Sequence, residues 1–120
     1  MNSESKAVLR YRDGRTERVD LAPIDHSRQI FTVTREDGTT GEIPYADLKA
    51  VFFPHKDGVA PEQADGSTIA VEFSDGEVIR GLAHYNPERN GFFLFPLDRS
   101  KNDRVFVVNS AIASIEVERL

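Results

Sequence analysis

The sequence contains no cysteine, and nowhere does it remain apolar for long. Without cysteine the chain has no disulfide framework, no thiolate zinc site and no thiol nucleophile, and it suits a reducing compartment. A helix that crosses a bilayer needs roughly 20 apolar residues, and no stretch approaches that length. Residues 1–6 lack the apolar segment of a secretion signal. We therefore expect a soluble cytoplasmic protein with no membrane insertion.

The chain also lacks an excess of basic residues. Its 15 Lys and Arg are outnumbered by 20 Asp and Glu, which gives a formal net charge of −5. Dedicated nucleic-acid binders usually carry a basic stripe that displaces counterions from phosphates. The charge balance therefore argues against nucleic acid as the partner.

No catalytic or metal-binding signature is present. The sequence has no nucleophile elbow and no glycine-rich phosphate loop. Its three histidines, His26, His55 and His84, are far apart and show no ligand spacing. We therefore predict no catalytic residue, no metal and no cofactor, and a protein that is not an enzyme.

The most informative stretch is residues 69–82. Ile69, Val71 and Phe73 alternate with other residues in the pattern of a half-buried strand. Asp75-Gly76 then predicts a hairpin with a type I′ turn, which would place Phe73 opposite Val78. Gly81 is expected where the next strand bends and where a side chain would crowd the neighbouring backbone.

The same pattern occurs earlier in the chain. Ala7, Leu9 and Tyr11 precede Asp13-Gly14 in the same alternation, at an offset of 62. This offset also carries Phe31 onto Phe93, whereas an offset of 64 carries Leu48, Val51 and Phe53 onto Ile112, Ile115 and Val117. A repeat of this period predicts two copies of one supersecondary unit.

The predicted fold is therefore all-β, with two tandem small barrel repeats packed together. Residues 1–53 form the first repeat, residues 54–67 a linker rich in Pro, Gly and charge, and residues 68–120 the second repeat. A single helical turn is expected at residues 44–48. The predicted strands cover residues 7–12, 15–21, 29–35, 41–44 and 50–53, then 68–74, 77–84, 91–96, 104–109 and 114–118.

The segment 92–97, Phe-Phe-Leu-Phe-Pro-Leu, is apolar on both faces of its predicted strand. Such a strand must bury both sides. One interpretation is that its second face packs within the chain near Phe52 and Phe53, and we favour this because small units need shared burial. The other is that Phe52, Phe53, Phe92 and Phe95 form a surface for another protein or a second copy.

The pattern from Val71 to Leu82, with Asp75-Gly76 and Gly81, resembles the first signature of Sm-like proteins, which are small five-stranded barrels related in shape to SH3-like barrels. The resemblance implies the barrel fold. It does not imply RNA binding, because Asn109-Ser110 stands where the second signature of that family has Arg-Gly.

Over nearly its full length, the chain also resembles a little-characterised bacterial domain found alone or attached to signalling proteins. The shared order of motifs runs from Tyr-Arg-Asp-Gly through Asp-Leu-Lys-Ala-Val-Phe-Phe to Gly-Phe-Phe-Leu-Phe-Pro and Arg-Val-Phe-Val-Val. This resemblance implies a signalling or accessory module, and it supplies no activity or ligand.

Two polar groups of residues are candidate binding sites for a small anion or an acidic partner. Each also has a plainer explanation, since exposed strand arginines often only protect an edge and the loop residues are ordinary turn formers. The first group surrounds the first hairpin and consists of Arg10, Arg12, Arg15 and Arg18. The second lies in the loops of the second copy and consists of Tyr85, Arg89, Arg99, Lys101 and Arg104.

The function that we expect is a non-enzymatic interaction module in bacterial cytoplasmic signalling. The alternative is a receptor for an anionic nucleotide or a nucleic acid. The expected partner is another protein or a second copy of the chain.

Overall fold

The computed structural model describes residues 5–23, 28–55, 66–85, 88, 90–98 and 101–118. Within these ranges the backbone forms ten β-strands and two single turns of 3-10 helix. The predicted all-β fold is confirmed. In the part of the chain so described, no helix has both the length and the apolar character that crossing a membrane requires.

The first half of the chain provides five strands and one helical turn: β1 (Ser5–Tyr11), β2 (Thr16–Leu21), β3 (Ile30–Arg35), β4 (Thr40–Pro44), η1 (Tyr45–Asp47) and β5 (Leu48–Pro54). The second half provides the same series: β6 (Ser67–Phe73), β7 (Val78–Ala83), β8 (Gly91–Pro96), β9 (Asn102–Val108), η2 (Asn109–Ala111) and β10 (Ile112–Val117). Each strand overlaps the segment predicted for it.

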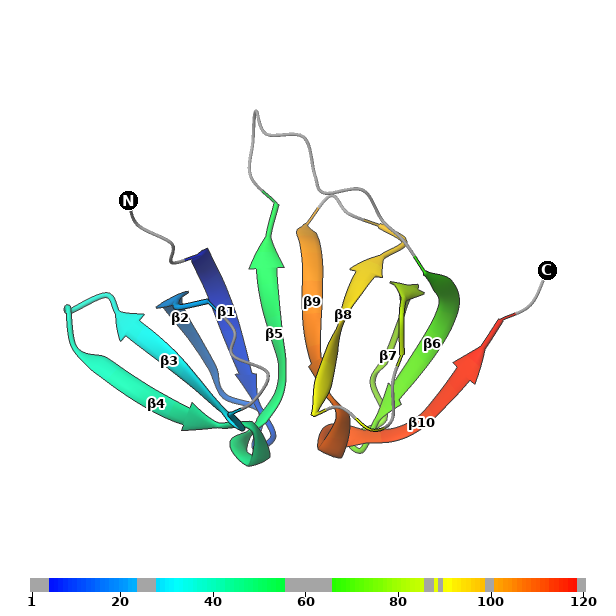
Figure 1. Ribbon diagram of the computed structural model, residues 1–120, viewed down its shortest axis with the longest axis horizontal. Coiled ribbons are helices and arrows are strands. Elements are labelled where there is room, and N and C mark those ends of the chain that lie inside the picture. Colours follow the sequence, from blue (N-terminus) through cyan, green and yellow to red (C-terminus); the bar gives the residue numbers. More distant parts are fainter. Residues whose placement is uncertain are drawn as a thin grey trace.

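All ten strands belong to one antiparallel sheet with the order β10-β6-β7-β8-β9-β5-β1-β2-β3-β4. The five strands of each half therefore follow the same order, in which the last strand lies beside the first. Strands β5 and β9 pair in the middle and join the halves, as the centre of Figure 1 shows. We call these two paired strands the seam.

The predicted barrels are not closed by strand pairing, and the sheet remains open. In the first half, closure would bring β5 back to β4, but both edges of β5 are occupied by β1 and β9. In the second half, β9 likewise pairs with β8 and β5 rather than with β10. The seam therefore uses the strand edges that closure of either half would need.

The predicted type I′ turn at Asp75-Gly76 is wrong. A type I′ turn needs a positive φ at both residues, but of these two only Gly76 has one, +93°; in the described ranges every residue with a positive φ is a glycine. Gly76 N–H donates to the carbonyl of Phe73 at 2.9 Å, and Phe73 N–H donates to that of Glu77 at 2.8 Å. This is a three-residue loop with a bulge at the glycine. Val78 therefore lies opposite Glu72 instead of Phe73, and it is 51 % exposed.

The close approach expected at Gly81 is confirmed. A Cβ atom placed on this residue would lie 2.3 Å from the carbonyl oxygen of Phe95 on the neighbouring strand. No side chain fits at that distance, so glycine is required where β7 and β8 meet.

The residue equivalent to Phe31 is Phe92, and the predicted match to Phe93 is wrong. Phe31 lies opposite Ile43, and Phe92 lies opposite the equivalent Val107. The connection before β8 is one residue shorter than the one before β3, since it spans 84–90 instead of 22–29. Phe92 is accordingly buried in the core, whereas Phe93 is half-buried on the other face of β8.

The buried apolar side chains of both halves form one connected core. Phe106 of β9 is fully buried, and its ring lies 5.5 Å from that of Phe31 and 5.8 Å from that of Tyr45, both in the first half. Phe53 of β5 packs on Phe93 of β8 at 6.0 Å. Aromatic side chains thus fill space on both sides of the seam.

Candidate functional site

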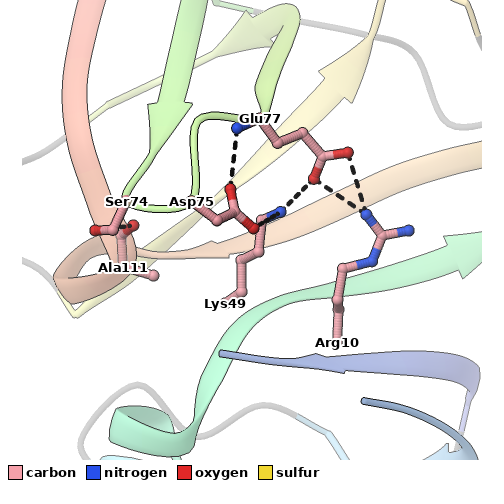
Figure 2. A network of polar contacts seen from close by, with 6 residues as sticks. All are labelled: Arg10, Lys49, Ser74, Asp75, Glu77 and Ala111. Carbon is pink, nitrogen blue, oxygen red and sulfur yellow. Dashed lines mark hydrogen bonds and ion pairs between the residues drawn. The ribbon is translucent and has the colours of Figure 1, made fainter. Parts of the chain in front are cut away.

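A buried lysine marks the seam. Lys49 lies on β5 and is 5 % exposed, which makes it the one charged residue buried in the described part of the chain. Its Nζ donates to Asp75 Oδ2 at 2.7 Å and to Glu77 Oε1. Both carboxylates belong to the hairpin between β6 and β7, in the other half (Figure 2). A buried ammonium needs such partners because burial removes its hydration.

Arg10 of β1 extends this network. Its guanidinium donates to both carboxylate oxygens of Glu77, at 3.1 and 3.2 Å, and it lies 4.4 Å from the centre of the Phe52 ring. Figure 2 shows the two cations reaching the same hairpin from β1 and β5. Two positive and two negative groups meet here, so the cluster is electrically balanced.

The network perturbs the carboxyl group of Asp75. A hydrogen bond from the Lys49 ammonium, followed by one from the backbone N–H of Glu77, lowers the pKa of Asp75 below its usual value. Asp75 is therefore ionised over the physiological range, and it holds Lys49 as a permanent counter-ion.

Arg12 connects the two helical turns. Its Nε donates to the carbonyl of Leu48 at 3.0 Å, and its Nη2 donates both to the carbonyl of Tyr45 at 3.4 Å and to the hydroxyl of Ser110 in η2. A cavity of about 60 Å³ lies between Arg12, Lys49 and Phe73. That volume suits a few water molecules and is far below the 300–1,000 Å³ of a typical ligand pocket.

The predicted arginine group does not converge on one site. Arg15 is held by Asp13 of its own hairpin at 2.7 Å and lies 4.6 Å from the centre of the Tyr11 ring. Arg10 and Arg12 bind groups of the protein across the seam, as described above. Arg18 lies on β2 and lines a separate groove.

This groove, of about 570 Å³, lies on the first half of the sheet. Ala7, Val8, Val19 and Pro54 give it an apolar lining. Lys6 lies opposite Asp20 on the neighbouring strand, so charges of both signs are placed side by side. Its polar lining consists of Lys6, Arg18, Asp20, Thr34, Glu36 and His55.

One end of the groove is fixed to the second half. The Nδ1 atom of His55 lies 2.8 Å from Asp103 Oδ1, and the His55 backbone N–H donates to the carbonyl of Lys101 at 2.9 Å. These contacts continue the pairing of the seam beyond β5. The groove is therefore joined to the second half at this end.

The second predicted group is not a cluster in the described residues. Arg104 lies over the rings of both Phe53 and Phe93, with its guanidinium 4.6 and 4.7 Å from their centres. Tyr85 is exposed and contacts Phe92 edge-on at 5.3 Å, while Lys101 is exposed just before β9. Arg89 and Arg99 lie outside the described residues.

The four phenylalanines predicted as an interface lie mostly inside the protein. Phe52 and Phe53 are buried on β5 at the seam, and Phe92 is buried in the core. Phe95 is half-buried on the other face of β8. Three of the four are therefore inaccessible to a partner in the folded chain.

Sequence reasoning missed Lys49, Asp75 and Glu77 as a site. A signal was available, because Lys49 interrupts the apolar run from Leu48 to Phe53, where a charge needs a specific partner. Its partners were not readable, since they lie 26 and 28 residues away. Across the described ranges, no three His, Asp or Glu residues are placed to hold a metal ion.

The comparisons with known proteins give one match. A family described as a family of unknown function (DUF6982) matches residues 3–119. Comparison with curated proteins gives no match, and comparison with solved structures gives none.

Proposed function

This chain belongs to the family of unknown function DUF6982, and from its own residues we propose that it is a non-enzymatic interaction module of bacterial cytoplasmic signalling that binds another protein. The observation that supports this proposal is the groove on the first half. The signalling role rests on the resemblance to domains attached to signalling proteins.

The lining of the groove favours a peptide segment over an anion. Its volume of about 570 Å³ is within the range of specific binding sites. Lys6 and Arg18 suit acidic side chains, while Asp20 and Glu36 suit basic ones and repel phosphates. Val8 and Pro54 offer apolar contact between them. An extended segment with charges of both signs matches this surface.

We also propose that the scaffold consists of two Sm-like or SH3-like repeats, residues 1–53 and 68–120, joined by the linker 54–67. The shared strand order supports this. So do matching hydrogen bonds, because Arg12 N–H donates to the carbonyl of Asp47 at 3.0 Å, as Ser74 N–H does to that of Ala111. Such a scaffold would hold the groove rigid.

The alternative, a receptor for an anionic nucleotide or nucleic acid, has less support. It requires free cations close together. Arg10, Arg15 and Lys49 are paired with carboxylates of the protein, and the cavity beside Arg12 is too small for a nucleotide.

Site-specific photo-crosslinking in native cells tests the proposal. A photo-reactive phenylalanine analogue replaces Val8 in the groove or, as a control, the exposed Val78 on the second half. We expect a crosslinked protein from position 8 alone. The double reversal Lys6→Glu with Arg18→Glu should abolish this product. Equal products from positions 8 and 78, or none from position 8, would contradict the proposal.

Isothermal titration with ATP, GTP and a cyclic dinucleotide addresses the alternative. We expect no saturable heat. Micromolar binding that is lost in Arg12→Ala would replace the protein-binding proposal with the nucleotide receptor.

A further inference from the structure

The two outer edges of the sheet are the counterparts of the two strands that form the seam. Among the described strands, β4 and β10 each have one neighbour, and they lie at opposite ends of the molecule (Figure 1). By position in the repeat, β4 corresponds to β9 and β10 corresponds to β5, each at an offset of 64. We propose that β10 of one chain pairs with β4 of a second copy, so that the seam is repeated head to tail between chains.

The observed seam supplies the register of this contact. In the seam, Ala50 lies opposite Val107 and Phe53 lies opposite Arg104. The offset of 64 converts these pairs into Ser114 opposite Ile43, and Val117 opposite Thr40. Between them, Ile115 faces Glu42 and Glu116 faces Gly41. Like charges directly opposite each other would destabilise the pairing, and this register has none.

Charge complementarity is kept with its signs reversed. Across the seam, Arg10 of the first half binds Glu77 of the second at 3.1 Å. At the offset of 62, their counterparts are Glu72 and Arg15. Glu72 of one chain therefore meets Arg15 of the next, an acid in place of a base and a base in place of an acid. Both residues are exposed, and the Arg15 side chain is 70 % exposed.

Apolar side chains on the edge strand β10 remain exposed, whereas their counterparts at the seam are covered. Ile115 and Val117 lie opposite the buried Val71 and Ile69, on the inner face of the sheet, yet Val117 is 51 % exposed. Their counterparts at the seam, Val51 and Phe53, are 0 % and 6 % exposed. A second copy on this edge would cover Ile115 and Val117 in the same way.

The contact between chains is weaker than the seam. Glu116 stands at the position of Phe52, Glu42 at that of Phe106, and Ala113 at that of Lys49, so the largest apolar contacts and the buried ion pair are absent. Charged residues and the proline at the end of β4 limit edge pairing. Association is therefore reversible and depends on concentration. Because the two edges differ, each added chain leaves a free edge until a ring closes.

Sedimentation equilibrium over a wide concentration range, with circular dichroism to confirm folding, tests the contact. The mass of the wild type should rise above 13.5 kDa with concentration. Arg15→Glu and Glu72→Arg should each weaken association about tenfold, by loss of the pair and added repulsion. The double exchange should restore it, and Lys101→Glu, at an exposed position just before the central strand β9, should change nothing. A constant mass of 13.5 kDa, or association that ignores both reversals, would overturn the proposal.

A second measurement uses the absence of cysteine. Thr40→Cys and Val117→Cys, placed in separate chains and mixed under oxidising conditions, should form a disulfide-linked heterodimer because the two positions face each other in the proposed register. The matched pair Thr40→Cys and Val78→Cys combines equally exposed positions that do not face each other. Equal yields from the two pairs would contradict the register.

Discussion

The two Asp-Gly hairpins are nearly identical in backbone and different in what they hold. In the first, Tyr11 N–H donates to the carbonyl of Arg15 at 2.9 Å, and in the second Phe73 N–H donates to that of Glu77 at 2.8 Å. Each aspartate accepts a hydrogen bond from the backbone N–H two residues later. The local sequence therefore sets the same turn twice.

The side chains beyond the turn give each hairpin its own role. Asp13 binds Arg15 of its own loop and remains on the surface. Asp75 and Glu77 bind Lys49 and Arg10 of the other half. The comparison teaches that a repeated turn can serve as a plain connection in one place and as half of an internal interface in the other.

The largest expected effect comes from reversing the buried charge. Lys49→Glu places a third carboxylate beside Asp75 and Glu77, and we expect it to lower the free energy of unfolding by about 3–5 kcal/mol, the range for breaking a buried ion pair. Ala113→Glu changes the counterpart position, which is exposed, and should cost under about 0.5 kcal/mol. Denaturant midpoints measure both. Similar losses of stability in the two variants would show that the Lys49 position is no more sensitive to a negative charge than its exposed counterpart.

Lys49→Met separates charge from volume at the same position. It keeps a long side chain on β5 and leaves Asp75 and Glu77 in water, where their side chains are 52 % and 40 % exposed. We expect its free energy of unfolding to lie within about 1 kcal/mol of the wild-type value, because the substitution removes the buried ammonium and leaves no buried charge without a partner. A loss as large as that of Lys49→Glu would show that volume rather than charge is critical.

Replacing the turn glycine should cause a loss of stability of intermediate size, and the loss should be the same in both hairpins. Gly14 and Gly76 have φ values of +95° and +93°, and a Cβ at either meets nothing within 4 Å. Alanine at either position should therefore cost about 1–2 kcal/mol through backbone strain alone. Thermal or urea unfolding of Gly14→Ala and Gly76→Ala compares them. A much larger loss at Gly76 would mean that the turn conformation and the seam are coupled.

The smallest effect is a difference in acid sensitivity. The pKa of Asp75 is lowered first by Lys49, whereas that of Asp13 is lowered first by the backbone N–H of Arg15. A lowered folded pKa stabilises the protein above the unfolded value of 3.8, and this stabilisation is lost as pH falls through the folded pKa. Asp75→Asn and Asp13→Asn should each flatten the decline in stability below about pH 4.

Repeating both substitutions in the Lys49→Met variant distinguishes the contributions of the two carboxyl groups. There, Asp75→Asn should have much less effect on the acid decline, while Asp13→Asn should act as it does in the wild type. Unfolding followed by circular dichroism from about pH 5 to pH 2 gives the slopes. An unchanged effect of Asp75→Asn would assign its pKa shift to the turn rather than to the seam.

The strands and turns were predictable because they depend on local sequence. The alternation around Val71 is enough to predict a strand, and the glycine after Asp75 is enough to predict a turn. Each signal spans only a few residues. The type of turn was predicted wrongly, since a type I′ turn and a three-residue loop differ by the φ of one residue and share the Asp-Gly signal. The longer loop shifts the pairing by one residue, so that Val78 lies opposite Glu72 and faces solvent.

The core and the site depended on distant parts of the chain. Phe92 and Phe93 are both apolar, so periodicity cannot decide which is buried, and the length of the preceding loop decides it. Lys49 was overlooked because its partners are on another hairpin. The open sheet was missed for the same reason, because pairing of β5 with β9 depends on the whole second half.

The position of Phe106 has a consequence for folding during synthesis. When the ribosome has made the five strands of the first half, the side chain that covers Phe31 and Tyr45 has not yet been added. The nascent first half must therefore keep aromatic surface exposed to water or to a chaperone until β9 emerges. We therefore expect folding to wait until β9 has been synthesised, and we expect a fragment that ends between the halves to aggregate.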